Sequence, residues 1–346
     1  MASLKLLTSS QVKMMRPILS IPAPGATKMT LEQFYVKKAK KIGESWNSGR
    51  KVFIDNPDMK LNVRMGDGSH PLDFLFVELR KNGVKAIPVT GLPDDRDLAY
   101  LNACKKINSI DNLGVCIRLK PDDLLNLKIS NSAIGATLKA IGVTKEECHL
   151  LLDFGLIGDD EVAKFEGLAE RAINNLTDID LWKNFSISGI GLNMSKAVGN
   201  KVVKMSRHEL NIWKGLAGKS KTLKRLPEFG DYGLINPTES FEIDFRKIKF
   251  RAKIRYTISG DWLVIKWSGS KDSKTGRSEQ FREISKRLIG HAEFLGEKYS
   301  IGSKYIKDTA NGTVKGSGGM GNWITATTQH HIKLVLDQFS SSGGIS

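Results

Sequence analysis

Short apolar runs alternate with amphipathic helical stretches along most of this 346-residue chain. The apolar runs have strand length and are bounded by polar or Gly/Pro residues, which is typical of buried β-strands. The first six predicted strands are Pro17–Ala23, Lys51–Asn56, Lys85–Thr90, Gly114–Leu119, His149–Asp153 and Asn184–Ile190. A seventh is expected near Asp231–Ile235 and an eighth at Arg246–Tyr256. Helices between successive strands favour parallel pairing.

Helix start and stop signals lie between these strands. Thr30 is the expected N-cap of a helix that runs to about Glu44, with Gln33 in the capping-box position. Pro71 suits a first helical turn and Gly83 a helix end. The remaining predicted helices are Asp95–Ile107, one from about Asp122, one opening at Asp159–Glu161, Arg207–Leu216 and Ser278–Leu295.

Eight strands with helices between most of them indicate an α/β protein with a TIM-barrel-like (β/α)8 domain. An open doubly wound sheet is the alternative, although no GxGxxG motif follows the first strand. The expected organisation is an N-terminal extension at 1–16 and a barrel domain at 17–338. That domain includes a C-terminal β-hairpin and helix extension from about 258, and a flexible tail follows at 339–346.

The composition indicates a folded, strongly basic protein. Hydrophobic residues make up 40% of the chain, and the formal net charge is +16. Such an excess favours nucleic acid, nucleotides or acidic membranes as partners, although a merely basic, soluble protein would have the same composition. Three sparse cysteines favour a reducing compartment, and no apolar run has the length of a membrane span. The expected location is therefore the cytoplasm.

The predicted eighth strand has an unusual pattern. From Lys247 to Tyr256 every odd position is basic and every even position is apolar or aromatic. A strand with this pattern has one apolar face and one row of positive charge, which water or an anionic partner must satisfy. At the expected C-terminal rim, Arg255 and Lys253 beside Tyr256 are candidate phosphate contacts. The rest of the row is interpreted as a solvated surface.

In a barrel, the ends of the strands and the loops after them form the functional rim. This rule selects Asp55, Arg118, Asp153, Asp231 and Tyr232, with polar neighbours at Asn56, Lys120, Ser186 and Ser188. Carboxylates on separate strands could hold a divalent metal, and arginines can bind a phosphate bidentately. The alternative is that Asp153 and Arg118 are ion pairs inside the barrel and Asp231 is a turn residue.

Further basic and aromatic residues could contact a ligand. His330 could act as an acid or base at the rim, but a packing or capping role is the more common one. Between Lys201 and Arg225 there are eight basic residues and one acidic residue, which suggests a second positive surface or a solvated helix face. Tryptophans could stack on bases beside these charges, although core packing is more usual: Trp213, Trp262 and Trp267.

Several short motifs occur in a fixed order: IPVT, GVCIRL, LLLDFG, FGDYG, KIRYT and a closing tryptophan separated by six residues from HHI. In this order they resemble the beta protein family of phages and bacteria, from Pro17 to about Leu336. The resemblance implies a barrel-like domain from phages or from bacterial mobile and defence-associated regions. The first strand departs from the family pattern, because SIPAPGATK is apolar and Pro-rich. The residues on the recurrent motifs are Arg118, Asp153, Asp231, Tyr232, Arg255, Tyr256, Trp323, His330 and His331.

The leading hypothesis is a barrel that binds a nucleotide or nucleic-acid end at the C-terminal rim, and that could hydrolyse it. The expected catalytic residues are Asp153, Asp231, Tyr232 and His330, and the expected ligand contacts are Arg118, Lys253, Arg255, Tyr256, Trp323 and His331. A divalent metal at Asp55, Asp153 and Asp231 is a further option. The alternative is a non-catalytic scaffold or sensor that binds nucleic acid or other phage or defence proteins.

Overall fold

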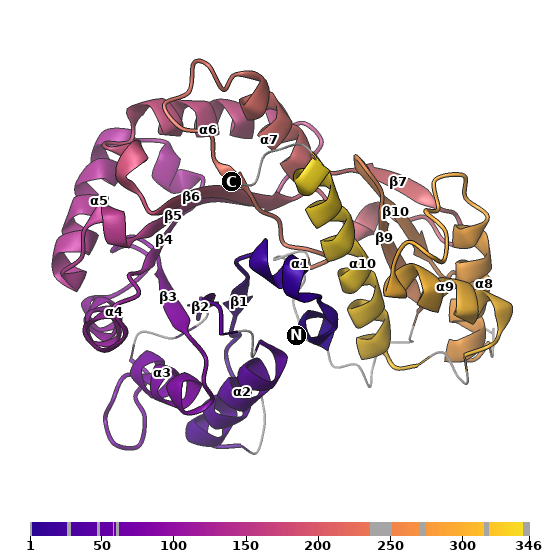
Figure 1. The fold of residues 1–346 in the computed structure, drawn as a ribbon, viewed down its shortest axis with the longest axis horizontal. Coiled ribbons are helices and arrows are strands. Elements are labelled where there is room, and N and C mark those ends of the chain that lie inside the picture. The colour runs from indigo at the N-terminus through magenta and orange to yellow at the C-terminus, as the bar shows by residue number, and fades with distance from the viewer. Residues whose placement is uncertain are drawn as a thin grey trace.

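A computed structural model describes residues 2–25, 29–46, 49–57, 59, 62–235, 251–269, 275–314 and 318–341. Its main feature is a curved parallel sheet of seven strands that follow one another in chain order (Figure 1). The strands are β1 Ile18–Ser20, β2 Val52–Asp55, β3 Ala86–Thr90, β4 Cys116–Leu119, β5 His149–Leu156, β6 Asn184–Ile190 and β8 Glu228–Phe229. This unbroken order excludes the doubly wound alternative, in which the strand order reverses.

Helices cover the outer face of the sheet. They are α2 Leu31–Ser45, α3 Pro71–Lys81, α4 Leu98–Asp111, α5 Leu127–Ile141, α6 Val162–Asn175 and α7 His208–Gly218. The predicted capping box of Thr30 and Gln33 opens α2, and His70 caps α3, in which Pro71 is the first residue. Because one set of alternate strand residues packs against these helices, the other set lines the inside of the curve. Short 3-10 turns connect some elements: η2 Asp122–Leu124, η3 Lys145–Glu147, η4 Ile179–Leu181 and η5 Met194–Lys196.

The inside of the curve contains an apolar layer between two polar ends. This layer consists of Phe53, Ile87, Val89, Cys116 and Leu151. On the side where the strands begin, the inner face carries His149, and on the side where they end it carries Arg118 and Asp153. The sheet therefore presents two separate mouths, one at each end of its strands.

A second, antiparallel sheet lies beside the first. Its strand order is β7 Val203–Ser206, β10 Asp261–Lys266 and β9 Lys253–Thr257. Three helices pack with it: α8 Arg277–Ile289, α9 Ile301–Asn311 and α10 Met320–Ser341. In Figure 1 the yellow helix α10 lies between the two sheets.

The placement of the basic strand in a barrel was wrong. Lys253–Thr257 pairs with β10 in the small sheet, while 246–250 lies outside the described residues. A central strand of a parallel sheet is covered on both faces and is apolar throughout, which this sequence is not. The predicted strand at Asp231–Ile235 was also misplaced, since the seventh parallel strand is Glu228–Phe229 and Asp231 follows it in a loop.

The segment before β1 and the helix α10 meet at the open edge of the large sheet. No pairing among the described residues joins β1 to β8, but Arg16 and Glu228 form an ion pair across this gap. The N-terminal turns η1 Ala2–Leu6 and α1 Ser9–Lys13 precede β1, and η1 contacts α10. Phe339 of α10 stacks on Phe229 of β8 with ring centroids 4.7 Å apart.

The predicted tail begins inside α10, and its residues 342–346 lie outside the described part of the chain. The domain boundaries remain a prediction. Among the described residues, no helix has both the length and the apolar character needed to cross a membrane.

Candidate functional site

Arg118 is the centre of a polar cluster at the mouth where the parallel strands end. Its Nη1 donates to Asp55 Oδ2 at 2.5 Å, and its Nε donates to Asp153 Oδ2 at 2.5 Å. Its Nη2 donates to Tyr232 Oη at 2.7 Å, and that hydroxyl in turn donates to Asp153 Oδ2 at 2.7 Å. Four predicted rim residues, Asp55, Arg118, Asp153 and Tyr232, are therefore in direct contact. They come from β2, β4, β5 and the loop after β8.

The cluster extends to Arg96, which the sequence reasoning missed. Arg96 Nη2 donates to Asp55 Oδ1 at 3.0 Å, so one buried carboxylate lies between two guanidinium groups. Arg96 follows β3 within DDRD, and the rule that selected the other strand-end residues applies to this loop as well. The Arg96 guanidinium also lies over the Tyr100 ring, 4.8 Å from its centroid.

Burial and neighbouring charges set the protonation of this cluster. Burial raises the pKa of Asp55, while Arg118 and Arg96 oppose that shift. Burial, followed by the charge of Asp153, raises the pKa of Tyr232 well above its usual range, so the phenol stays protonated and can donate. Burial lowers the pKa of Arg118, but Asp153, Tyr232 and Asp55 outweigh it and raise the value overall.

Two buried polar atoms just after the ends of β2 and β3 have no hydrogen-bond partner among the described residues: Asn56 Oδ1 and Arg96 Nε. The other side of the Asn56 amide donates to Tyr35 Oη at 2.9 Å, which fixes its orientation. Tyr35 packs in the core between α2 and the sheet, so of these two atoms only Arg96 Nε belongs to the cluster at the mouth. Buried polar atoms are nearly always paired, which makes this donor a candidate contact for a ligand or for water.

Asp231 belongs to a different cluster from its neighbour Tyr232. Its Oδ2 lies 3.0 Å from His331 Nε2 and 3.6 Å from Arg207 Nη2. Arg207 is fully buried, and its Nη1 donates to Gln338 Oε1 of α10 at 2.9 Å. Burial alone would raise the pKa of Asp231, but His331 and Arg207 lower it to about 2. This charged cluster connects the loop after β8 to α7 and α10.

Glu209 completes this second cluster. Its Oε1 pairs with Arg207 Nε at 3.3 Å and its Oε2 accepts from the Gly191 amide at 2.8 Å. Burial raises the pKa of Glu209 to about 7, in spite of Arg207. His331 stacks on Trp262 with ring centroids 4.9 Å apart, and its Nδ1 lies 2.9 Å from Thr257 Oγ1. These contacts support a positioning role for His331.

Three predicted site residues pack inside the small unit, which is the antiparallel sheet β7–β10–β9 with helices α8, α9 and α10. No contact joins them to the Arg118 cluster in the described structure. His330 is fully buried, with Nε2 2.8 Å from the Thr257 carbonyl and Nδ1 3.0 Å from Ser300 Oγ. Tyr256 stacks on His330, with centroids 4.0 Å apart. Trp323 stacks on Phe281 at 4.1 Å. Their burial favours core packing over ligand contact.

The two predicted basic contacts on β9, Lys253 and Arg255, lie on one face of that strand with Thr257, by strand alternation. Val264 is opposite Arg255 in the pairing with β10, and it packs with Leu192 and Leu234. Lys253 is exposed, whereas Arg255 is partly buried. Their role in ligand binding remains a prediction.

A divalent metal site gains no support from the geometry. The described residues contain no group of three or more His, Cys, Asp or Glu side chains that could hold an ion. Asp55 and Asp153 face Arg118, and Asp231 faces His331 and Arg207. An arginine already occupies the position between the carboxylates of the first cluster.

The basic segment Lys201–Arg225 contains several internally paired charges. Lys219 pairs with Glu166 and Glu170, and Arg225 donates to backbone carbonyls, including Trp182 O at 2.5 Å. Trp213 and Trp262 are also engaged: Trp213 Nε1 donates to Pro227 O, and Trp262 is fully buried. Trp267 packs against the core of the small unit. Much of this segment therefore serves the fold.

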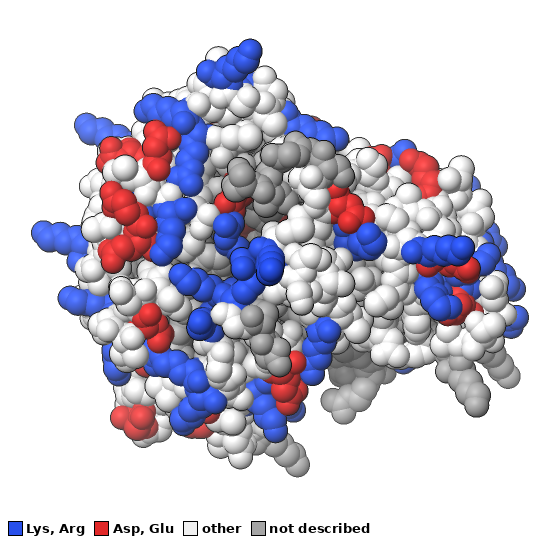
Figure 2. Space-filling model, viewed as in Figure 1, with Lys and Arg blue, Asp and Glu red and all other residues white. Residues whose placement is uncertain are grey.

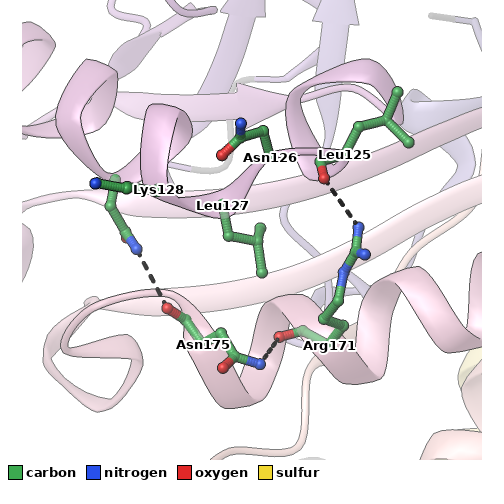
Figure 3. A pocket seen from close by; sticks show the side chains of 7 residues that line it. Leu125, Asn126, Leu127, Lys128, Arg171 and Asn175 are labelled. Carbon is green, nitrogen blue, oxygen red and sulfur yellow. Dashed lines mark hydrogen bonds between the residues drawn. The ribbon is translucent and has the colours of Figure 1, made fainter.

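A surface depression of about 510 Å³ lies on the helical flank between α5 and α6 (Figure 3). Arg171 Nη2 donates to Leu124 O at 2.6 Å, and Asn131 Nδ2 donates to Asn175 O at 3.2 Å. Because these polar groups bind neighbouring backbone atoms, the depression is best explained by packing between the helices.

The fold and the site together define an α/β protein with a curled, seven-stranded parallel half-barrel and a charge-paired polar mouth. The chain belongs to the Beta protein family, whose model matches residues 1–337. Among solved structures it is similar to triosephosphate isomerase from Bartonella henselae, with 12% identity and a TM-score of 0.29 over 63% of this chain and 91% of the isomerase. No curated protein matches the sequence.

Proposed function

We propose that this protein binds a phosphate-bearing ligand, a nucleotide or a nucleic-acid end, at the mouth where its parallel strands end. The observation that most supports this proposal is that two arginines, Arg118 and Arg96, share the buried carboxylate of Asp55. Such shared pairing holds both guanidinium groups in place before a ligand arrives, which lowers the entropic cost of binding. Arginine is the side chain best suited to a phosphate because it presents several donors in one plane.

Arg96 is the better candidate for direct contact. The donors of Arg118 point at Asp55, Asp153 and Tyr232, whereas Arg96 Nε is buried and lacks a partner among the described residues. Arg118 then acts mainly by fixing the carboxylates of Asp55 and Asp153.

Binding is better supported than hydrolysis. Asp153 accepts from Arg118, from Tyr232 and, through Oδ1, from the Gly155 amide at 3.0 Å. A carboxylate with all these partners is poorly placed to take a proton from water. The protonated Tyr232 remains the candidate proton donor if the ligand is turned over.

We further propose that the half-barrel is a (β/α)8 barrel in which the ends of the chain replace the eighth unit. The Arg16–Glu228 ion pair and the stacking of Phe339 on Phe229 support this interpretation.

Association with phages or with defence systems remains a proposal from the family resemblance. The non-catalytic scaffold is the second candidate function, and the net charge of +16 favours it.

Calorimetric titration with inorganic pyrophosphate and with ATP tests the proposal. Arg96→Gln should weaken binding by about tenfold or more, because a charge-assisted contact is lost. Arg80→Gln is the matched control, since Arg80 also pairs with an aspartate, Asp111, but on the outer helices. Equal affinity in wild type and Arg96→Gln would refute the proposed site. If wild type released phosphate in the presence of magnesium and Asp153→Asn did not, the protein would be a hydrolase and the proposal of binding alone would be wrong.

A further inference from the structure

The opposite mouth of the half-barrel, where the strands begin, carries a group of basic side chains. Lys51 and Lys85 each come two residues before an inward-facing strand residue, Phe53 and Ile87. By strand alternation they share that inner face. Lys183 precedes β6, and its charge acts on Lys51 together with that of Lys85. All three lysines are exposed at this end of the sheet.

His149 lies in the middle of this group and is buried, with 6% of its surface exposed. It is the first residue of β5, and Phe53 contacts it edge-on with ring centroids 4.8 Å apart. Neither ring nitrogen has a hydrogen-bond partner among the described residues. The Asn184 side chain lies beside the ring and slightly favours its protonated form, and its amide Nδ2 donates to Glu228 Oε1 at 2.9 Å.

The local charge balance favours an anion at this mouth. Burial, followed by the charges of Lys183, Arg16 and Lys51, lowers the pKa of His149 to about 4, so the ring is neutral at pH 7 and keeps one N–H donor. Glu228 pairs with Arg16, but none of the lysines Lys51, Lys85 and Lys183 has an ion-pair partner in the described structure. Figure 2 shows Lys and Arg side chains around a hollow inside the curved sheet.

The recess is closed on its inner side. The apolar layer of Phe53, Ile87, Val89, Cys116 and Leu151 separates it from the mouth that contains Arg118. A ligand at this end therefore meets lysine ammonium groups first and the His149 ring last, and it cannot reach the Arg118 cluster. A compact anionic group fits these surroundings better than an extended apolar molecule.

We infer that the strand-start mouth is a second, separate anion site, in which Lys51, Lys85 and Lys183 surround a phosphate group and His149 donates a hydrogen bond to it. The inference does not depend on the site at Arg118, since the two share no residue. The phosphate could belong to a free phosphate compound or to a nucleic-acid backbone, and both offer the same oxygen acceptors to these donors.

Histidine-selective NMR tests the inference, because the chain has only six histidines. The His149 signal is assigned by its loss in His149→Asn. Inorganic pyrophosphate should shift that signal in wild type. In the double variant Lys51→Ala/Lys85→Ala, the pyrophosphate concentration that gives half of the full shift should rise by about tenfold or more. The control is Lys37→Ala/Lys40→Ala, which removes the same charge from exposed positions of α2.

A thymidine oligonucleotide of about ten residues without terminal phosphate separates the two sources of phosphate. If it shifts the His149 signal, the site accepts backbone phosphates; if only pyrophosphate shifts it, the site selects free phosphate compounds. An unmoved His149 signal with both probes would overturn the inference, as would equal midpoints in wild type and the lysine double variant. Arg96→Gln should leave the titration of the His149 signal with pyrophosphate unchanged. The two proposed sites are therefore tested independently, and one can be refuted while the other stands.

Discussion

Tyr232 donates a hydrogen bond to Asp153 Oδ2 at 2.7 Å, although 79 residues separate them in the sequence. Asp231, the residue next to Tyr232, contacts His331 and Arg207 instead. Two adjacent side chains thus join two different parts of the molecule, the mouth of the half-barrel and the packing of α10. The loop after β8 is therefore the point where the polar mouth of the half-barrel and the docking of the small unit are mechanically connected.

Tyr232→Phe should lower the free energy of unfolding by about 2 kcal/mol, because Asp153 and Arg118 both lose a buried partner. Urea denaturation measures this change. Tyr299→Phe is the control, since it breaks a hydroxyl–carboxylate bond to Asp337 at the surface and should cost less than about 0.5 kcal/mol. Equal effects of the two variants would contradict the structural importance given to the Tyr232 hydroxyl.

Arg207→Ala should destabilise the protein by about 3–5 kcal/mol, because it removes a buried cation that pairs with Asp231 and with Glu209. Adding Glu209→Gln to this variant should cost little more, since Glu209 has a pKa of about 7 even beside Arg207 and becomes neutral without it. Chemical denaturation of the four proteins of a double-mutant cycle measures the coupling. Strictly additive losses would show that Arg207 and Glu209 do not act as a pair.

Acid should destabilise the protein partly through His330. Burial lowers the pKa of His330 from 6.5 to about 4. Between pH 6.5 and pH 4 this histidine is therefore protonated in the unfolded chain but neutral in the folded protein, so a falling pH favours unfolding. Stability from this histidine is complete above pH 6.5 and falls by an amount on the order of 3 kcal/mol as the pH approaches 4. The difference between wild type and His330→Gln, followed by denaturation at several pH values, should show this dependence. A constant difference would contradict it.

Phe339→Ala should cost about 3–5 kcal/mol, because the ring is buried against Phe229 and Trp213. Thermal or urea unfolding measures the loss. Ile110→Ala, a truncation at a residue 58% exposed, is the control and should change stability by less than about 0.5 kcal/mol. If Phe339→Ala behaved like the control, α10 would not be needed at the edge of the large sheet.

The first six strands and the helices between them could be predicted because each carries its own local signals. The polar rim followed from the same reasoning, since parallel strands place their ends at one edge, and Arg118, Asp153 and Tyr232 do meet there. Arg96 was missed because the predicted helix began at Asp95, which placed Arg96 inside that helix, whereas α4 begins at Leu98 and leaves Arg96 in the loop after β3. The hairpin that pairs the basic strand with Asp261–Lys266 was predicted correctly. The sheet was wrong, because strand alternation does not specify which sheet a hairpin joins.

The stacking of Phe339 on Phe229 places α10 at the open edge of the large sheet, where the ion pair between Arg16 and Glu228 bridges the gap from β8 to the segment before β1. During synthesis on the ribosome, β1 and β8 emerge long before α10 does. Until Phe339 leaves the exit tunnel, a nascent chain exposes two unprotected sheet edges, which are sites for aggregation. Translation that stops before α10 should therefore leave a product that needs a chaperone or is degraded.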